Sequence, residues 1–434
     1  MASMRKLAGL LFVVLLVLIP GVPGFAKTTI TFWHDWGGEG GEVIGSLVNA
    51  FNKSQQDVEV KVVLTTSLGQ KLMAAVAGGA APDVVLLDRY TTNEFAANGA
   101  LTRLDDLIKG DKLLQPSTFF PATWREANWR GAQYGIPTQT DSRVLLFLKS
   151  VLEEAGISAE NPPDTWDELR QASVKLTRRQ ADGKLTRAGY VPTWGNISAK
   201  DYIWQNGGEL LNPELTKVVW DSQAAVEAIQ WVVEFADFYG GLGAIDAFGG
   251  QVDWSIGGPL GPMLKGQVAI LYEGSWTLGE VLRNFPDIYQ NDLGAGLPPL
   301  KVKRATLSGG HGLVIPAGTP AARVKAALEF IRYFVSPETQ VRFALGTGVI
   351  PANVQAAVNK QLVQDPVRRV FIQAMEFAHI RPPHPAYPSI EGYLWDAWWR
   401  SLRHEAAVQA ALEESARKAQ QVLDRYNKHY GIIK

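Results

Sequence analysis

The most constraining feature of the sequence is a regular alternation of strand and helix patterns over residues 29–87. Residues 29–33 and 58–64 alternate apolar and polar side chains, as a half-buried strand does, whereas residues 41–51 and 68–77 carry apolar side chains at helical spacing. Residues 84–87 form a short apolar run, typical of a strand that is buried on both faces of a parallel sheet. The order strand, helix, strand, helix, strand predicts an α/β fold.

Further helices are predicted along the rest of the chain. A capping box formed by Thr165 and Glu168 predicts a helix toward Lys175. Apolar spacing predicts helices through residues 226–236 and 324–334, and Ser336-Pro337 predicts the start of another helix, whereas the polar residues 178–187 indicate a solvated loop or hairpin. A chain of 434 residues exceeds what one hydrophobic core usually serves, so we expect two lobes. The sequence shows neither repeats nor a low-complexity linker, and we therefore expect short crossings between the lobes.

The amino-terminal segment predicts export. Arg5 and Lys6 precede an apolar run over residues 7–19, which is followed by small residues that end at Ala26. The run is shorter than the roughly 20 residues that a membrane-spanning helix needs, so residues 1–26 are predicted to be a cleaved signal peptide. The alternative is an uncleaved anchor. In either case the mature part lies in the periplasm or at the outer face of the cytoplasmic membrane.

Composition argues against several functional classes. The chain has no cysteine, which removes disulfides, thiolate ligands and a lipidated cysteine anchor. The net charge is −1 and no basic run is present, which argues against nucleic acid as a partner. His379 and His384 are separated by Arg-Pro-Pro, which cannot continue a helix that would present both imidazoles to one metal ion. We expect no metal site and no cofactor.

The densest polar and aromatic cluster follows the first predicted strand. Trp33, His34, Asp35 and Trp36 stand at its carboxyl end, where ligands of open α/β sheets bind, and Gly37-Gly38 permit close backbone approach. A sugar ring packs an apolar C–H face on aromatic rings and bonds its hydroxyl groups to carboxylates and amides. The cluster therefore predicts a sugar site. The alternative is a packed strand end with a buried histidine.

Five further segments supply candidate ligand contacts. Asp88-Arg89-Tyr90 follows the apolar strand. Asp88 is expected to bind two adjacent hydroxyl groups while Arg89 neutralises its charge. The alternative is that Asp88 and Arg89 form a structural salt bridge. The other segments end strands or turns with polar groups and aromatic rings. Their candidate residues are Gln139 and Asp141 within residues 134–141, Trp204 and Asn206 within 202–208, Glu273 and Trp276 within 266–276, and Gly310 and His311 within 308–312.

The ordered set of motifs resembles a known family. Residues 30–33 (ITFW), 75–85 (AVAGGAAPDVV), 131–137 (GAQYGIP), 162–169 (PPDTWDEL), 206–208 (NGG), 274–276 (GSW), 327–331 (ALEFI) and 347–351 (TGVIP) occur in family order. Together they resemble the sugar-binding class of bacterial extracellular solute-binding proteins, the family of the maltose-binding protein that serves ABC importers. The resemblance covers essentially the whole mature chain.

The resemblance implies a periplasmic-binding-protein-like fold, with two α/β lobes that close on a ligand about a hinge. Residues 27–138 with 303–346 are expected to form one lobe, and residues 139–302 with 347–434 the other. In this family pattern, Asp88 and Arg89 match hydroxyl-binding residues. Trp204 and Trp276 match the stacking aromatic residues. Glu273 takes a position that often holds a polar contact with the ligand, and His311 lies near the return crossing between the lobes. One departure is Phe147-Leu148-Lys149, where the family has Tyr-Asn-Lys. Residues 34–36 and the loop 381–387, which ends at Tyr387, are expected to set which sugar fits.

The predicted function is binding, without catalysis, of a neutral mono- or oligosaccharide by a monomer that delivers it to the permease subunits of an ABC importer. A phosphorylated polyol such as glycerol 3-phosphate is the alternative ligand, although Asp35, Asp88, Asp141 and Glu273 would repel a dianion. A glycoside hydrolase, which also places two carboxylates across a cleft, is the remote alternative.

Overall fold

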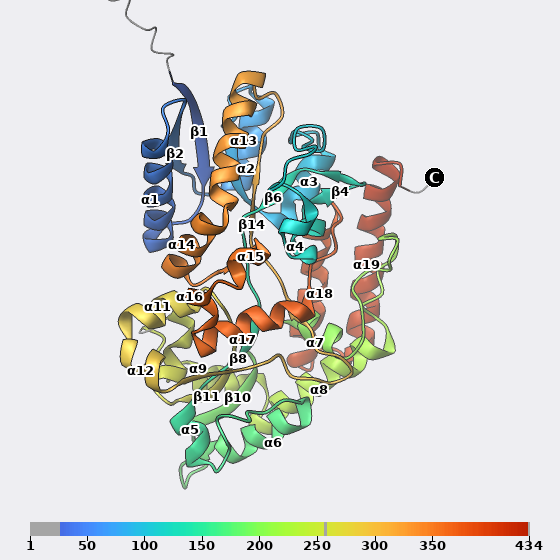
Figure 1. Cartoon of the computed structure of the whole chain (residues 1–434). Coiled ribbons are helices and arrows are strands. Elements are labelled where there is room, and N and C mark those ends of the chain that lie inside the picture. The colour runs from blue at the N-terminus through green and yellow to red at the C-terminus, as the bar shows by residue number, and fades with distance from the viewer. Residues whose placement is uncertain (1–26, 256–257, 433–434) are drawn as a thin grey trace, which may run out of the picture.

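The computed structural model describes residues 27–255 and 258–432, which form two α/β lobes stacked one above the other (Figure 1). Each lobe contains one five-stranded sheet. The predicted signal peptide, residues 1–26, lies outside the described residues. Within the described ranges, no helix combines the length and the apolar character that a membrane crossing requires.

The sheet of lobe 1, shown at the top of Figure 1, is completed by segments far apart in the sequence. Its order is β2 (Val58–Leu64), β1 (Thr28–His34), β3 (Val84–Asp88), β14 (His311–Val314) and β6 (Gly135–Pro137). The first three strands are parallel, and β14 runs antiparallel to both β3 and β6. The carboxyl ends of β1 and β3 therefore meet the start of β14 at one edge, which faces lobe 2.

Two faces of this sheet bury two separate apolar cores. Alternate residues of a strand point to opposite faces, so Ile30 and Phe32 of β1 pack with α1 (Gly38–Ser54) and α13 (Ala321–Val335), whereas Trp33 packs on the other face. That other face is covered by α2 (Leu68–Ala77) and α3 (Thr92–Ala97). The pleat thus sends neighbouring residues of the first motif in opposite directions.

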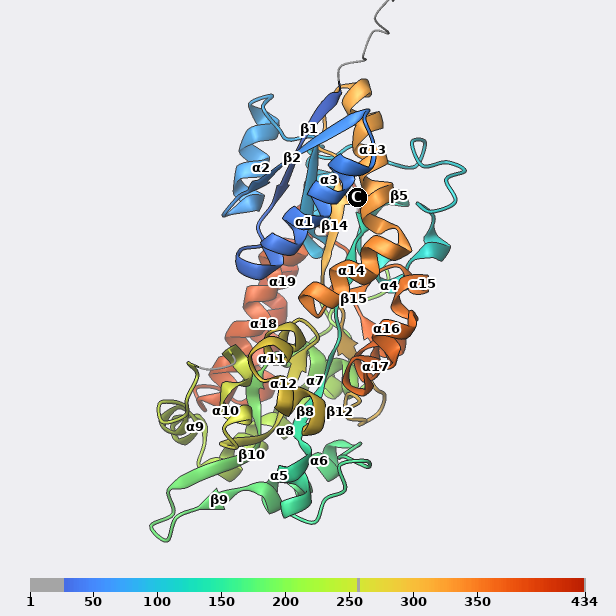
Figure 2. The ribbon, with the colours of Figure 1, turned by 60° about the vertical axis from the view of Figure 1, so that its left-hand side comes forward.

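Lobe 2 is built on the strand order β12 (Leu293–Gly296), β8 (Arg143–Leu148), β11 (Val268–Gly274), β10 (Leu185–Gly195) and β9 (Arg178–Arg179). Only β10 and β11 run parallel among these pairs. The two carboxyl-terminal helices, α18 (Tyr387–Leu402) and α19 (Val408–His429), join this core and run alongside both lobes (Figures 1 and 2).

The remaining helices are mostly short and pack around the two sheets. They are α4 (Pro121–Glu126), α5 (Lys149–Glu154), α6 (Trp166–Leu176), α7 (Ala199–Gln205), α8 (Gln223–Tyr239), α9 (Leu242–Gly249), α10 (Gly261–Leu264), α11 (Thr277–Asn284), α12 (Pro286–Asn291), α14 (Pro337–Thr347), α15 (Val354–Ala357), α16 (Lys360–Val363) and α17 (Pro366–Ala374).

The local predictions are confirmed. Strands β1, β2 and β3 and helices α1 and α2 lie where the residue patterns placed them, and α6 begins with the reciprocal capping box of Thr165 and Glu168. Helices α8 and α13 cover the two apolar patterns, Ser336 caps α14, and the polar stretch after α6 forms the β9–β10 hairpin.

Small two-stranded ladders join the lobes. β7 (Gln139–Thr140) pairs with β15 (Ile350–Pro351), and β13 (Thr306–Leu307) pairs with β16 (Ala378–His379). A hairpin of β4 (Asn128–Trp129) and β5 (Ala132–Gln133) lies beside lobe 1. The expectation of short crossings is met, and the expected lobe boundaries, 27–138 with 303–346 and 139–302 with 347–434, remain a proposal.

Two glycines in lobes 1 and 2 should respond in opposite ways to alanine. A Cβ on Gly189 of β10 would lie 2.2 Å from the Ser173 carbonyl oxygen of α6, whereas a Cβ on Gly45 within α1 would meet no atom within 4 Å. We expect Gly189→Ala to lower the free energy of unfolding by about 1–3 kcal/mol, and Gly45→Ala to raise it by about 0.5–1 kcal/mol. Urea unfolding measures both; equal effects would contradict the close packing of α6 on β10.

Candidate functional site

Two indole rings from opposite lobes line one cavity between the lobes. Trp36 follows β1, Trp276 follows β11, and the cavity of about 410 Å³ that they share is also lined by Glu39, Gly40, Glu280, Arg283, Asn284, Gly346 and Thr347. The Trp36 ring packs on Phe343, with ring centroids 5.4 Å apart, and the Arg143 guanidinium lies 4.9 Å from the Trp276 ring centroid. Trp36 therefore packs on its own lobe, whereas Trp276 contacts Arg143 of lobe 2 and also packs against the apolar core of lobe 1.

Polar groups of lobe 1 border the same region. His311 lies opposite Asp88 in the β14–β3 ladder, and its Nε2 is 3.3 Å from the Trp36 indole nitrogen and 3.9 Å from Asp35 Oδ1. Burial lowers the pKa of His311, so the imidazole is neutral at pH 7. The cluster offers carboxylate acceptors beside a neutral ring, which suits hydroxyl groups.

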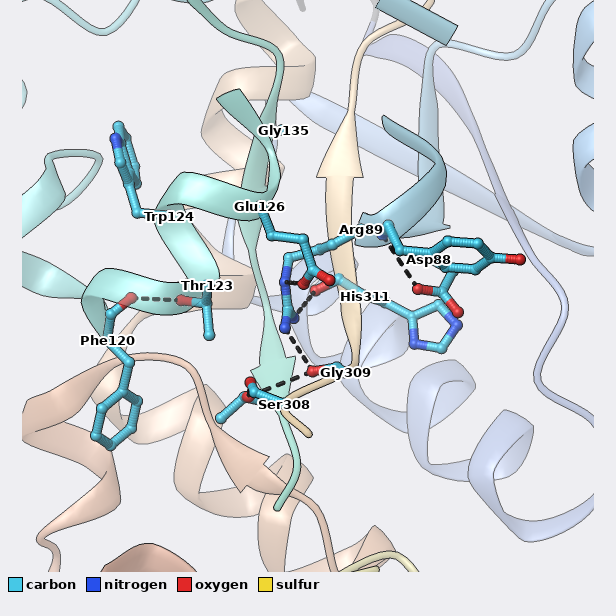
Figure 3. A network of polar contacts seen from close by, with 12 residues as sticks. Asp88, Arg89, Phe120, Thr123, Trp124, Glu126, Gly135, Ser308, Gly309 and His311 are labelled. Atoms are coloured by element: carbon cyan, nitrogen blue, oxygen red, sulfur yellow. Dashed lines mark hydrogen bonds and ion pairs between the residues drawn. The ribbon is translucent and has the colours of Figure 1, made fainter. Parts of the chain in front are cut away.

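Arg89 does not act as the sequence predicted. Its guanidinium is fully buried and points away from the cleft, with Nε 3.0 Å from Glu126 Oε2 of α4 (Figure 3). Its remaining donors reach the carbonyl oxygens of Gln139, Gly309 and His311 on the two crossing strands. The expected pairing of Arg89 with Asp88 is therefore wrong, both as neutralisation of a ligand-binding carboxylate and as a structural salt bridge, because Arg89 pairs with Glu126 instead.

Gly310 allows the crossing strands to approach each other. Its φ of +118° is strained for other residues, and a Cβ there would lie 2.3 Å from Gln139 Oε1 and 2.7 Å from Arg89 Nη1. The Gln139 side chain accepts from the His311 backbone N–H at 2.7 Å, and its Nε2 lies 2.9 Å from His311 Nδ1. Gln139 and Gly310 thus orient His311 from behind.

A second buried network lies under Trp276. Arg143 pairs with Asp141 and donates to Asn196 Oδ1 at 2.9 Å, while Asp141 accepts from the Gly309 backbone N–H at 2.7 Å. Glu273 is 2% exposed, and burial raises its pKa to about 7 against the opposing effects of the Gly274 N–H and Arg143. Asp141 and Arg143 tie the crossings to β8, which fixes the guanidinium beneath the indole.

The structure divides the predicted site residues into two groups. Eight are partly or fully exposed: Trp33, Asp35, Trp36, Asp88, Tyr90, Asp141, Trp276 and His311. The other eight are buried: His34, Arg89, Gln139, Trp204, Asn206, Glu273, Gly310 and Tyr387.

Four of the buried residues contact neighbouring protein groups, two through ring packing and two through hydrogen bonds. His34 points to the Phe32 face of β1, Trp204 is 2% exposed and packs on His379, the Asn206 amide donates to Ala224 O, and the Tyr387 hydroxyl donates to Glu391. Their direct contact with a ligand remains a prediction, while the structure gives each a packing or hydrogen-bonding role.

Sequence reasoning missed a charged cluster beside Asp88. The Arg381 guanidinium lies 4.5 Å from the Tyr90 ring centroid, and Lys200 Nζ of α7 is 2.9 Å from Glu391 Oε1 of α18. Arg381 belongs to the loop that was expected to set sugar choice, but no local pattern distinguished Lys200 or Glu391. Among the described residues, no group of three or more His, Asp or Glu side chains is arranged to hold a metal ion.

Comparisons with known proteins agree on the family. A family model described as bacterial extracellular solute-binding protein matches residues 46–369. The sn-glycerol-3-phosphate-binding periplasmic protein UgpB of Pectobacterium atrosepticum is 25% identical over 350 residues, which cover 76% of this chain and 74% of the relative. UgpB of Agrobacterium fabrum is 25% identical over 348 residues, covering 76% of each chain.

Solved structures share the two-lobed fold. A solute-binding protein of an ABC transporter from Thermotoga lettingae, bound with α-D-tagatose, has a TM-score of 0.75 and 25% identity over 92% of this chain and 100% of its own. The sugar-binding protein MalE of Xanthomonas citri has a TM-score of 0.80 and 22% identity over 93% and 99% of the two chains. The expected periplasmic-binding-protein-like α/β fold is confirmed.

The buried carboxyl of Glu273 generates a pH prediction. Because its pKa lies near 7 in the folded protein and near 4.5 when exposed, the folded state retains a proton that the unfolded state has lost between these values. Stability of the wild type relative to Glu273→Gln should therefore fall as pH rises from 5 to 8, by on the order of 3 kcal/mol.

Urea unfolding at several pH values measures this difference, with Glu414→Gln as the control. Hydrogen bonds from Lys418 and Arg400 lower the pKa of Glu414 to about 2, so its difference should be flat from pH 5 to 8. A flat profile for Glu273→Gln as well would contradict the burial argument.

Proposed function

The chain belongs to the bacterial extracellular solute-binding proteins, and from this premise we propose that it binds a neutral sugar between its lobes and delivers it to an ABC importer. The family supports the predicted export, and the described residues include two lobes of the kind that close on a ligand. The permease subunits as partners, a monomeric state and the absence of catalysis are parts of this proposal.

The observation that carries the sugar proposal is the pair of indoles, Trp36 and Trp276, that faces one cavity from two lobes. A pyranose or furanose ring has C–H faces that pack on aromatic rings, and this cavity offers two of them. Asp35 and Asp88 beside them supply carboxylate acceptors for hydroxyl groups. The tagatose-bound relative from Thermotoga lettingae agrees with a ligand of this class.

Closure about the crossings would turn binding into a signal. Glu39 of α1 and Arg283 of α11 form an ion pair between the lobes beside the cavity. A ligand that contacts both lobes stabilises the closed arrangement by its differential affinity, and the importer would recognise that arrangement. Binding energy then shifts a conformational equilibrium and no bond is broken.

A phosphorylated polyol is the second candidate ligand. The UgpB relatives are named for sn-glycerol 3-phosphate. In the structure, Arg381 and Lys200 also place two cations beside Asp88, which could attract a phosphate group. Against this, Lys200 is paired with Glu391, and Asp35 and Asp88 border the same cleft. The surplus of carboxylates favours an uncharged ligand.

The proposal is tested by calorimetry of the mature protein with tagatose, maltose, mannobiose and sn-glycerol 3-phosphate. We expect stoichiometric binding of at least one neutral sugar, which is recovered unchanged after incubation. Heat with the phosphate and none with any sugar would replace the first candidate with the second. Turnover of the bound sugar would instead support a glycoside hydrolase.

Trp276 should contribute to binding by stacking. Trp276→Ala is expected to leave the circular dichroism spectrum intact and to weaken sugar binding by about 1 kcal/mol or more, the scale of one aromatic contact. The matched control is Trp254→Ala, because Trp254 is a partly exposed indole that packs on Trp194 outside the cavity lining. Loss of folding with unchanged affinity in the folded fraction would assign Trp276 to the core.

A further inference from the structure

Arg381 is a charged residue beside Asp88 with two side-chain donor atoms that make no hydrogen bond in the described part of the chain. Burial by itself lowers the pKa of Arg381. The carboxylates of Asp88, Glu391 and Glu126 together outweigh this effect and raise the pKa above its ordinary value, so the guanidinium stays charged. Yet no acceptor in the described part of the chain lies within hydrogen-bonding distance of its Nε and Nη1. Buried donors without partners are costly, so such atoms point to an acceptor from outside the chain.

The nearby carboxylates of Glu391 and Glu126 make no hydrogen bond with Arg381. Glu391 Oε1 accepts from Lys200 Nζ at 2.9 Å and from the Tyr387 hydroxyl at 3.2 Å, and it is 3.9 Å from Arg381 Nε, which is too long for a hydrogen bond. Glu126 Oε2 accepts from Arg89 Nε at 3.0 Å, and Glu126 Oε1 has no hydrogen-bond partner in the described part of the chain, so neither oxygen bonds to Arg381. The surrounding carboxylates therefore compensate the charge of Arg381 without using its donors.

Tyr90 fixes the orientation of the guanidinium. Its ring lies 4.5 Å from Arg381 Cζ, a cation–π contact that holds the guanidinium over the ring face. Tyr90 directly follows Asp88 and Arg89 in lobe 1, whereas Arg381 comes from the segment between β16 and α18. The Arg381 side chain is 17% exposed, so the surrounding protein does not fully enclose it.

We propose that Arg381 is a specificity-determining donor of the cleft, which gives hydrogen bonds from Nε and Nη1 to two neighbouring oxygens of a neutral sugar while Asp88 accepts from its hydroxyl groups. This inference rests on the proposed function and narrows its ligand class. A planar fork suits adjacent oxygens on one ring, and lysine cannot reproduce that geometry. Arg381, Lys200 and Arg89 face the three carboxylates of Asp88, Glu391 and Glu126, so the charges are matched and the site calls for acceptor atoms and not for an anionic group.

The test measures binding of tagatose, maltose, mannobiose, D-glucuronate and sn-glycerol 3-phosphate to wild type, Arg381→Lys, Arg381→Met and a control. The control is Arg403→Met, since Arg403 also lies near an aromatic ring, Trp399, at 5.9 Å, but at the far end of α18. For each neutral sugar that wild type binds, Arg381→Lys and Arg381→Met should weaken affinity by about 10- to 100-fold. Arg403→Met should stay within twofold of wild type.

If both Arg381 variants bind that sugar as tightly as the wild-type protein does, the inference is overturned and the proposed function stands. If the wild-type protein binds no neutral sugar, the proposed function and the inference are overturned together. Preferential binding of glucuronate or the phosphate, lost in Arg381→Lys, also overturns it, because the guanidinium would then serve an anion. Should either variant fail to fold, a crystal structure of wild type with the bound sugar decides: sugar oxygens at hydrogen-bonding distance from Nε and Nη1 support the inference, and their absence there overturns it.

Discussion

The arrangement of both lobes depends on one buried guanidinium. Arg89 leaves the end of β3, pairs with Glu126 and donates to carbonyl oxygens on two separate crossing strands. Removing one partner of a buried ion pair typically costs about 3–5 kcal/mol, because the other charge stays buried without compensation. The crossings are therefore anchored to lobe 1 and not merely adjacent to it, and the register that sets His311 opposite Asp88 follows from that anchoring.

Some charged side chains are used up in buried ion pairs, and others remain available to a ligand. The Arg89–Glu126 and Arg143–Asp141 pairs consume two guanidiniums below the cleft surface, which leaves Asp35, Asp88 and Arg381 around the interlobe space. The indoles of Trp36 and Trp276 line the same cavity. A site of this kind combines stacking with hydrogen bonds of both polarities, which is the recognition chemistry of an uncharged polyol.

Local order could be predicted from the sequence, and tertiary pairing could not. Strand alternation, the Thr165 capping box and the Ser336 cap are signals carried within a few residues, so the elements were found with small boundary errors. The Trp33–Trp36 motif shows where such signals end: the pleat of β1 turns His34 into the core, and Trp36, which lies beyond the end of β1, lines the cavity. The partner of Arg89 lies 37 residues away and that of Tyr90 is Arg381, contacts that no local pattern encodes.

The sheet of lobe 1 has a consequence for how the chain reaches its compartment. Strand β3 cannot acquire its second neighbour until β14 has emerged, and the ladder joins residues as distant as Asp88 and His311. A polypeptide threaded through a membrane with its amino terminus first would therefore keep an open sheet edge until most of its length had crossed. Non-local pairing slows folding, so the same topology that builds the cleft also delays the completion of the lobe 1 sheet.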